Sequence, residues 1–124
     1  MEVALVGAGN LGKAIADYAG FAGKGFVITS IFDTDGTKIG TRMGIENVAV
    51  MDVSALGQTI RDREISVGII ATPAEHAQGV ARTMVDAGIR AILNYAPITI
   101  TVPSNVRVQY IDPVVGLQRM TYYL

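Results

Sequence analysis

Short apolar runs rich in Val, Ile and Ala alternate along the chain with longer segments that carry apolar residues at helical spacing. Such runs, bounded by Gly, Pro, Asp or Asn, are typical of buried strands. The expected strands are Val3–Val6, Phe26–Phe32, Val48–Met51, Val67–Ala71, Ala91–Asn94 and Val106–Tyr110. The expected helices are Leu11–Ala19, Val53–Arg63 and Ala74–Ala87. This alternation predicts an α/β fold with a parallel sheet, right-handed crossovers and helices on both faces.

Three residues mark the ends of the predicted helices. Asp52 is a good N-cap for the second helix, Pro73 suits the first turn of the third, and Gly88 is a stop signal after it. The pattern therefore predicts helix boundaries as well as helices.

The end of the chain departs from this alternation. Asp112 followed by Pro113 predicts a last helix over residues 113–124, and its apolar residues cover most of its circumference. A helix of this kind is buried on most sides, either against a partner chain or against its own sheet. We expect residues 1–112 to form the α/β domain and residues 113–124 a C-terminal helix, which in the first case is a dimerisation helix.

Composition narrows the class of protein. The 124 residues are enough for one domain, and half of them are hydrophobic, which excludes a disordered chain. The net charge of −1 gives no cationic excess for binding duplex DNA, and the absence of cysteine excludes a thiolate zinc site. No signal peptide or membrane-spanning run is present in the sequence given, so we expect a cytoplasmic protein with no membrane association.

A glycine-rich turn joins the first predicted strand to the first predicted helix. Residues 7–12, Gly-Ala-Gly-Asn-Leu-Gly, match G-x-G-x-x-G in the context that a dinucleotide requires. Gly7 permits the tight turn, Gly9 lets the backbone approach a pyrophosphate, and Gly12 allows close helix packing. Asp33 follows the second strand at the spacing of a ribose-binding acid, so the fold is expected to be Rossmann-like and to favour NAD(H) over NADP(H). The alternative is an ordinary tight corner beside a solvated aspartate.

Two further loops are expected at the same crevice. Thr72-Pro73 and Asn94-Tyr95-Ala96-Pro97 each follow a buried strand, and parallel strands present their carboxyl ends to the ligand. They would form a rigid, mainly apolar wall for a nicotinamide ring. Ordinary turn chemistry accounts for these residues equally well.

Residues for acid–base catalysis are few. His76 is the single histidine and falls in the first turn of a predicted helix, where we expect an exposed surface residue. Tyr18, Tyr95 and Lys13 are conceivable proton donors, but no Tyr-x-x-x-Lys pattern accompanies them. We therefore expect no catalytic residue and no enzymatic turnover.

Successive blocks of the chain, residues 2–35, 67–97 and 110–124, resemble the NAD(H)-binding domain of the Rex family of redox-sensing transcriptional repressors. The resemblance implies a non-catalytic sensor of the NADH/NAD⁺ ratio and a homodimer that exchanges the C-terminal helix. By position it implies contacts from the glycine-rich turn, Asp33 and the two loops. The implied cofactor-binding residues are Gly7, Ala8, Gly9, Asn10, Leu11, Gly12, Asp33, Thr72, Pro73, Asn94, Tyr95, Ala96 and Pro97.

The resemblance also implies a switch pair, Tyr18 and Asp112, in which the aspartate comes from the other protomer. Rex proteins bind DNA through a winged-helix domain that precedes this one, and here Met1 stands directly before the first strand. We expect either the sensor domain of such a repressor or a stand-alone relative. Pro113 stands where the family usually has a larger apolar residue near the nicotinamide.

Two other functions compete with the sensor. Thr72-Pro73 followed by His76 is similar to the turn beside nicotinamide in sugar and polyol dehydrogenases, but those enzymes usually have Glu-Lys-Pro where Tyr95-Ala96-Pro97 stands. A CoA-binding domain of the succinyl-CoA synthetase type shares the architecture and would not need Asp33.

Overall fold

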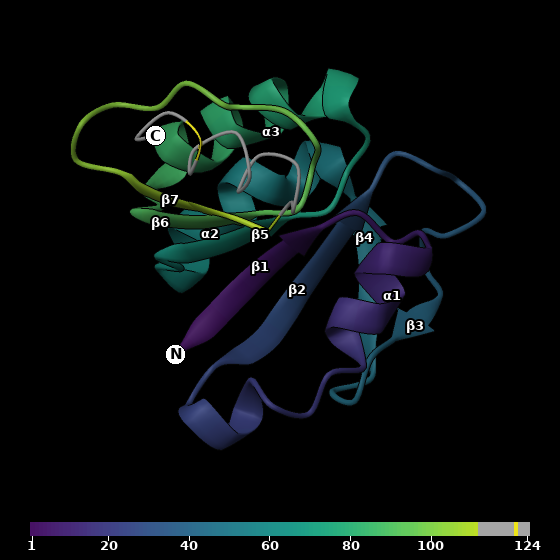
Figure 1. The fold of residues 1–124 in the computed structure, drawn as a ribbon. Helices are drawn as coiled ribbons and strands as arrows, with labels where there is room; N and C mark the ends of the chain where they lie inside the picture. Colours follow the sequence, from purple (N-terminus) through teal and green to yellow (C-terminus); the bar gives the residue numbers. More distant parts are fainter. Residues whose placement is uncertain (112–120, 122–124) are drawn as a thin grey trace.

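Seven strands join into one sheet in the computed structural model, which describes residues 1–111 and 121 (Figure 1). They are β1 (Glu2–Val6), β2 (Val27–Asp33), β3 (Arg42–Met43), β4 (Val48–Asp52), β5 (Val67–Ile70), β6 (Ala91–Asn94) and β7 (Arg107–Tyr110). Their order is β3-β4-β2-β1-β5-β6-β7. All neighbours pair in parallel except β3, which runs antiparallel to β4. The six predicted strands are confirmed, and β3 was missed because two residues carry no readable period.

The helices agree with the predicted segments except at some ends. They are α1 (Asn10–Ala16), the 3₁₀ turns η1 (Ala22–Lys24) and η2 (Val53–Ala55), α2 (Leu56–Arg63) and α3 (Ala74–Ala87). The prediction that the first helix reaches Ala19 is wrong, because α1 ends at Ala16. The Tyr18 amide donates to Ile15 O at 3.1 Å, which is an i to i−3 bond that closes the helix. The prediction for Asp52 is confirmed, since its carboxylate accepts a 2.9 Å hydrogen bond from the Ser54 amide. Gly88 ends α3 in the left-handed conformation as predicted, while Pro73 is its N-cap residue.

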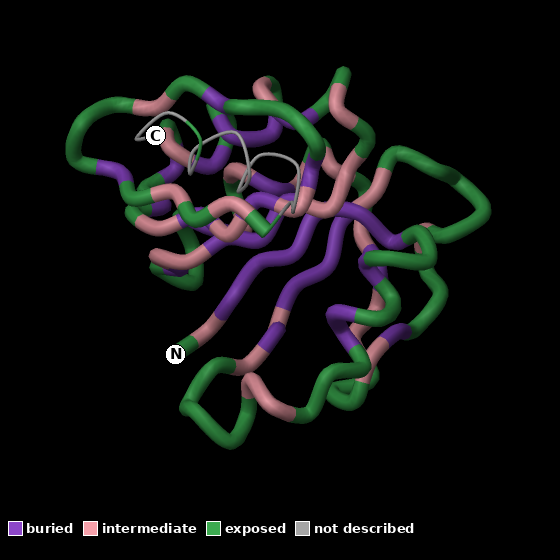
Figure 2. Tube along the Cα trace, in the orientation of Figure 1, coloured by how far each residue is buried: buried purple, intermediate pink, exposed green. Residues whose placement is uncertain are grey.

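Alternating side chains of the strands bury both faces of the sheet. Val3 and Leu5 pack with residues of α1, whereas Ala4 and Val6 pack with residues of α2 and α3. The helix α1 lies on one side of the sheet and α2 and α3 on the other (Figure 1). Buried residues follow the central strands almost without a break (Figure 2). The expected parallel sheet with helices on both faces is confirmed. Successive side chains of a strand point to opposite faces, and because both faces are buried, near-continuous apolar runs occur in the sequence.

The chain reverses its direction of winding across the sheet at β1. β2 and β4 lie on one side of β1, whereas β5, β6 and β7 lie on the other. The loops at this switch point are held in line by backbone bonds, from Gly7 N to Phe32 O and from Ala71 N to Val6 O, each 2.8 Å long. Ligands of open α/β sheets bind in the crevice at such a point.

The predicted dimerisation helix, residues 113–124, and Asp112 lie outside the described residues, apart from Thr121. The division into residues 1–112 and 113–124 therefore stays a prediction. Within the described part of the chain, no helix combines the length and apolar character needed to cross a membrane.

The central sheet should govern stability. Phe32 is fully buried in the core between β2 and the helices α2 and α3, so Phe32→Ala is expected to lower the free energy of unfolding by about 3–5 kcal/mol. Phe26 is 38% exposed and provides a matched control, for which the loss should be below about 1 kcal/mol. Urea denaturation followed by circular dichroism measures both, and equal losses would contradict this account of the core.

Candidate functional site

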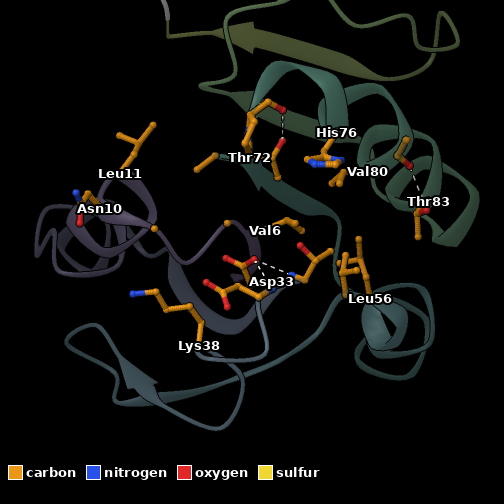
Figure 3. A pocket seen from close by; sticks show the side chains of 18 residues that line it. Val6, Asn10, Leu11, Asp33, Lys38, Leu56, Thr72, His76, Val80 and Thr83 are labelled. Carbon is orange, nitrogen blue, oxygen red and sulfur yellow. Dashed lines mark hydrogen bonds between the residues drawn. The ribbon is translucent and has the colours of Figure 1, made fainter.

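A pocket of 680 Å³ lies at the switch point, at the carboxyl ends of β1, β2 and β5. Asn10 and Leu11 stand on one side of it and Leu56 and Thr83 on the other, with Asp33 between them (Figure 3). Its lining comprises Val6, Gly7, Gly9, Asn10, Leu11, Asp33, Thr34, Asp35, Lys38, Val53, Leu56, Ala71, Thr72, Pro73, His76, Gly79, Val80 and Thr83. The glycine-rich turn, Asp33 and Thr72-Pro73, which lie far apart in the sequence, therefore meet at one cavity.

The three glycines of the turn have different structural roles. Gly7 has a φ of 118°, and a Cβ on it would lie 2.5 Å from the carbonyl oxygen of Ala71. A Cβ on Gly12 would lie 1.8 Å from the carbonyl oxygen of Gly7. Both residues are thus required by the fold itself. Gly9 lines the pocket and has no atom within 4 Å of a Cβ position, so its bare backbone faces open space there.

Asp33 holds the glycine-rich turn to the loop after β2. One carboxylate oxygen accepts a 2.7 Å bond from the Ala8 amide, and the other accepts bonds from the amides of Thr34 and Asp35 at 2.6 and 3.0 Å. A carboxylate has about four lone-pair positions, so three amides leave room for a hydroxyl donor. Asp33 is half-buried at the pocket wall, where it brings both negative charge and a fixed acceptor.

The loop after Asp33 contributes two more charged groups to the lining, Asp35 and Lys38. The Thr37 hydroxyl donates to Asp35 at 2.7 Å and holds the pKa of that carboxyl below its usual range, with smaller contributions from the Thr37 amide and from Lys38. Asp35 is therefore occupied by its own turn, and Lys38 places a cation at the mouth of the pocket.

One face of α3 forms the wall opposite the glycine-rich turn. His76, Gly79, Val80 and Thr83 all line the pocket, and their spacing of i, i+3, i+4 and i+7 puts them on one helix face. His76 is exposed as expected, but its position in the pocket lining was not foreseen. The helical period was available in the sequence, although nothing there indicated that this face turns toward the cavity.

The second predicted loop is arranged differently. Asn94 is fully buried, and its side chain donates to Ile98 O at 3.0 Å and accepts from Ala96 N at 2.9 Å, so it shapes its own loop. None of the residues 94–97 is in the lining of the described pocket, and neither are Ala8 and Gly12. Cofactor contacts by residues 94–97 stay a prediction.

Tyr18 and Tyr95 lie close enough to interact electrostatically. Burial raises the pKa of the Tyr95 phenol, and the neighbouring Tyr18 phenol raises it further. Tyr18 is 59% exposed and packs edge-on against Phe21, with 5.0 Å between ring centroids. Lys13 pairs with Asp17 at 2.9 Å on the exposed side of α1 and is outside the pocket lining. Among the described residues no cluster of three or more metal ligands occurs.

The comparisons with known proteins agree with the resemblance found in the sequence. A family model described as "CoA binding domain" matches residues 1–98. The redox-sensing transcriptional repressor Rex of Chloroflexus aurantiacus is 51% identical over 122 residues, which are 98% of this chain and 57% of that protein. The resemblance to Rex repressors is confirmed, and the chain spans little more than half the length of such relatives.

Two crystal structures share the fold closely. RSP, a Rex-family repressor, in complex with β-NAD⁺ and operator DNA matches with a TM-score of 0.87 and 36% identity, covering 98% of this chain and 55% of that one. RSP in complex with β-NADH matches with a TM-score of 0.86 and 36% identity, covering 98% of this chain and 58% of that one.

The different roles of the glycines can be separated by stability. Gly12→Ala forces a Cβ against the Gly7 carbonyl oxygen and should cost at least about 2–3 kcal/mol of unfolding free energy. Gly9→Ala adds a methyl group to open space at a φ of −75°, so the change should stay below about 1 kcal/mol. Urea unfolding of both variants tests this, and a large loss in Gly9→Ala would show that Gly9 also serves the fold.

Proposed function

We propose that this chain, which belongs to the CoA binding domain family, is the NAD(H)-binding domain of a Rex-like redox-sensing repressor. It binds the dinucleotide without turning it over and reports the NADH/NAD⁺ ratio. The observation that carries the proposal is the placement of the Asp33 carboxylate beside the open backbone of Gly9 in one pocket. Support comes from the Rex repressors at up to 51% identity and from RSP, whose structures contain NAD⁺ or NADH.

Asp33 is the reason to prefer NAD(H) over coenzyme A, despite the description of the family. Coenzyme A and NADP(H) both carry a phosphate on the adenosine ribose, whereas NAD(H) has free hydroxyls there. An ionised carboxylate fixed by three backbone amides accepts bonds from hydroxyls and repels a phosphate. Lys38 in the pocket lining is exposed, so solvent screens its charge and it offsets only part of that repulsion.

Sensing rather than catalysis is proposed because the matching relatives are named as repressors. His76 faces the pocket from α3, alongside Gly79 and Val80. The residues proposed for the nicotinamide end of the ligand are different ones, namely Thr72, Pro73 and the loop 94–97. We assign the histidine to the ligand wall and not to proton transfer. A repressor with this role works in the cytoplasm.

The redox signal is proposed to pass through Tyr18 and Asp112 in a homodimer. Tyr18 is exposed, as a residue that faces a second protomer would be before assembly, and its phenol interacts electrostatically with that of Tyr95. In the proposal, the helix 113–124 of each protomer packs on the other and brings Asp112 to Tyr18. Operator DNA would be bound only through a winged-helix domain outside these residues, because the net charge here is −1.

Ligand titration tests the cofactor. NADH should bind at least about tenfold more tightly than NADPH or coenzyme A, a difference of about 1.4 kcal/mol. Asp33→Asn removes the negative charge and should narrow the preference for NADH. Asp35→Asn is the matched control: it removes a charge from a side chain that already accepts bonds from Thr37, so most of the preference should remain. Isothermal titration calorimetry with each ligand measures the ratios. Equal affinity for NADH and NADPH, or tighter binding of coenzyme A, would contradict the proposal.

Sedimentation tests the dimer. The full chain should sediment as a dimer, and deletion of residues 113–124 should produce a monomer of lower thermal stability, because the proposed exchanged helix is removed. An unchanged sedimentation coefficient distribution after the deletion would refute helix exchange.

A further inference from the structure

Gly79 occupies an unusual position for a glycine. It lies in the interior of the 14-residue helix α3, on the face that lines the pocket. Glycine destabilises a helix interior relative to alanine because it loses more backbone freedom on folding. A glycine there calls for a reason in packing, in backbone conformation or in the ligand.

The fold itself supplies no such reason. A Cβ on Gly79 would meet no atom within 4 Å, and Gly79 is not among the residues with positive φ. Gly57 in α2 is a useful contrast, since a Cβ there would already lie 3.7 Å from Cγ2 of Thr83 on α3. Gly57 sits at the contact between two helices, whereas Gly79 faces open space in the cavity.

The same combination of features occurs at Gly9, on the opposite side of the pocket. Both residues line the cavity, have an ordinary φ, and leave the Cβ position without neighbours. At Gly9 the bare backbone suits the approach of a pyrophosphate. The parallel suggests that α3 at Gly79 is also approached closely by part of the ligand.

We propose that Gly79 is a specificity-determining residue that leaves room for the adenine ring. This rests on the proposed NAD(H) function. Asp33 fixes the ribose on the β2 side of β1, and Val53 and Leu56, which follow the neighbouring strand β4, line the pocket on that side. Together with Val80 they form an apolar wall, which suits a flat base. The Thr83 hydroxyl donates to the Gly79 carbonyl at 3.2 Å, so this turn of α3 is held in place (Figure 3).

Substitution separates a ligand role from a structural one. Gly79→Ala and Gly79→Leu place side chains in the space assigned to adenine, while Gly57→Ala adds a methyl group outside the pocket lining. Affinities for NADH, ADP-ribose and reduced nicotinamide mononucleotide are measured by calorimetry, and the stability of each ligand-free variant by urea unfolding.

Gly79→Ala should raise the urea midpoint of the ligand-free protein and weaken NADH and ADP-ribose by roughly tenfold, with a larger loss for Gly79→Leu. Gly57→Ala should leave these affinities unchanged, and reduced nicotinamide mononucleotide should bind all variants equally. A lower urea midpoint in Gly79→Ala would overturn the inference, as would unchanged ADP-ribose affinity in both Gly79 variants. If the unaltered chain binds neither NADH nor ADP-ribose, the proposed function itself fails.

Discussion

The close approach of α1 to the turn after β1 determines the geometry of the site. Gly12 lies directly against the Gly7 carbonyl, at a distance that no side chain permits, and Gly7 lies against the carbonyl of Ala71, which follows β5. This packing leaves the Gly9 backbone facing the pocket and sets the Ala8 amide against Asp33. One steric constraint in the core of the fold therefore positions both the surface proposed for the pyrophosphate and the acid proposed for the ribose.

The Asp33 carboxylate has two roles, the proposed selection of the ligand by charge and the fixing of two loops by hydrogen bonds. Its carboxylate accepts amides from Ala8, Thr34 and Asp35, so it ties the glycine-rich turn to the loop after β2. An asparagine side chain has a single acceptor oxygen, so it would leave either the Ala8 amide or the amides of Thr34 and Asp35 without an acceptor. The residue proposed to exclude a ribose phosphate is thus also the one that holds the two loops in register, and the two properties are not independent.

The sequence predicts the fold well because each long element carries a strong local signal, as in the unbroken apolar run from Val3 to Val6 or the capping of Val53–Arg63 by Asp52. It fails where local signals are short or neutral, as for β3 and the early end of α1. For the candidate site, the glycine-rich motif of residues 7–12 and the acid Asp33 could be found from their spacing in the sequence. The pocket-lining roles of His76 and Gly79 depend on how α3 is rotated on the sheet, and the burial of Asn94 depends on a loop that folds back on it.

The described pocket bears on how the proposed sensor would respond to its two ligands. Oxidised and reduced cofactors share the same adenosine and pyrophosphate and differ in the charge of the nicotinamide. Contacts to the shared half, proposed at Asp33, Gly9 and the α3 wall, would change both affinities by the same factor and could not shift an equilibrium that depends on their difference. In the proposed sensor the adenosine pocket therefore sets the concentration at which the protein is saturated. In this proposal the NADH/NAD⁺ ratio at which the protein switches is set at the nicotinamide end, for which Thr72, Pro73 and residues 94–97 are the proposed contacts.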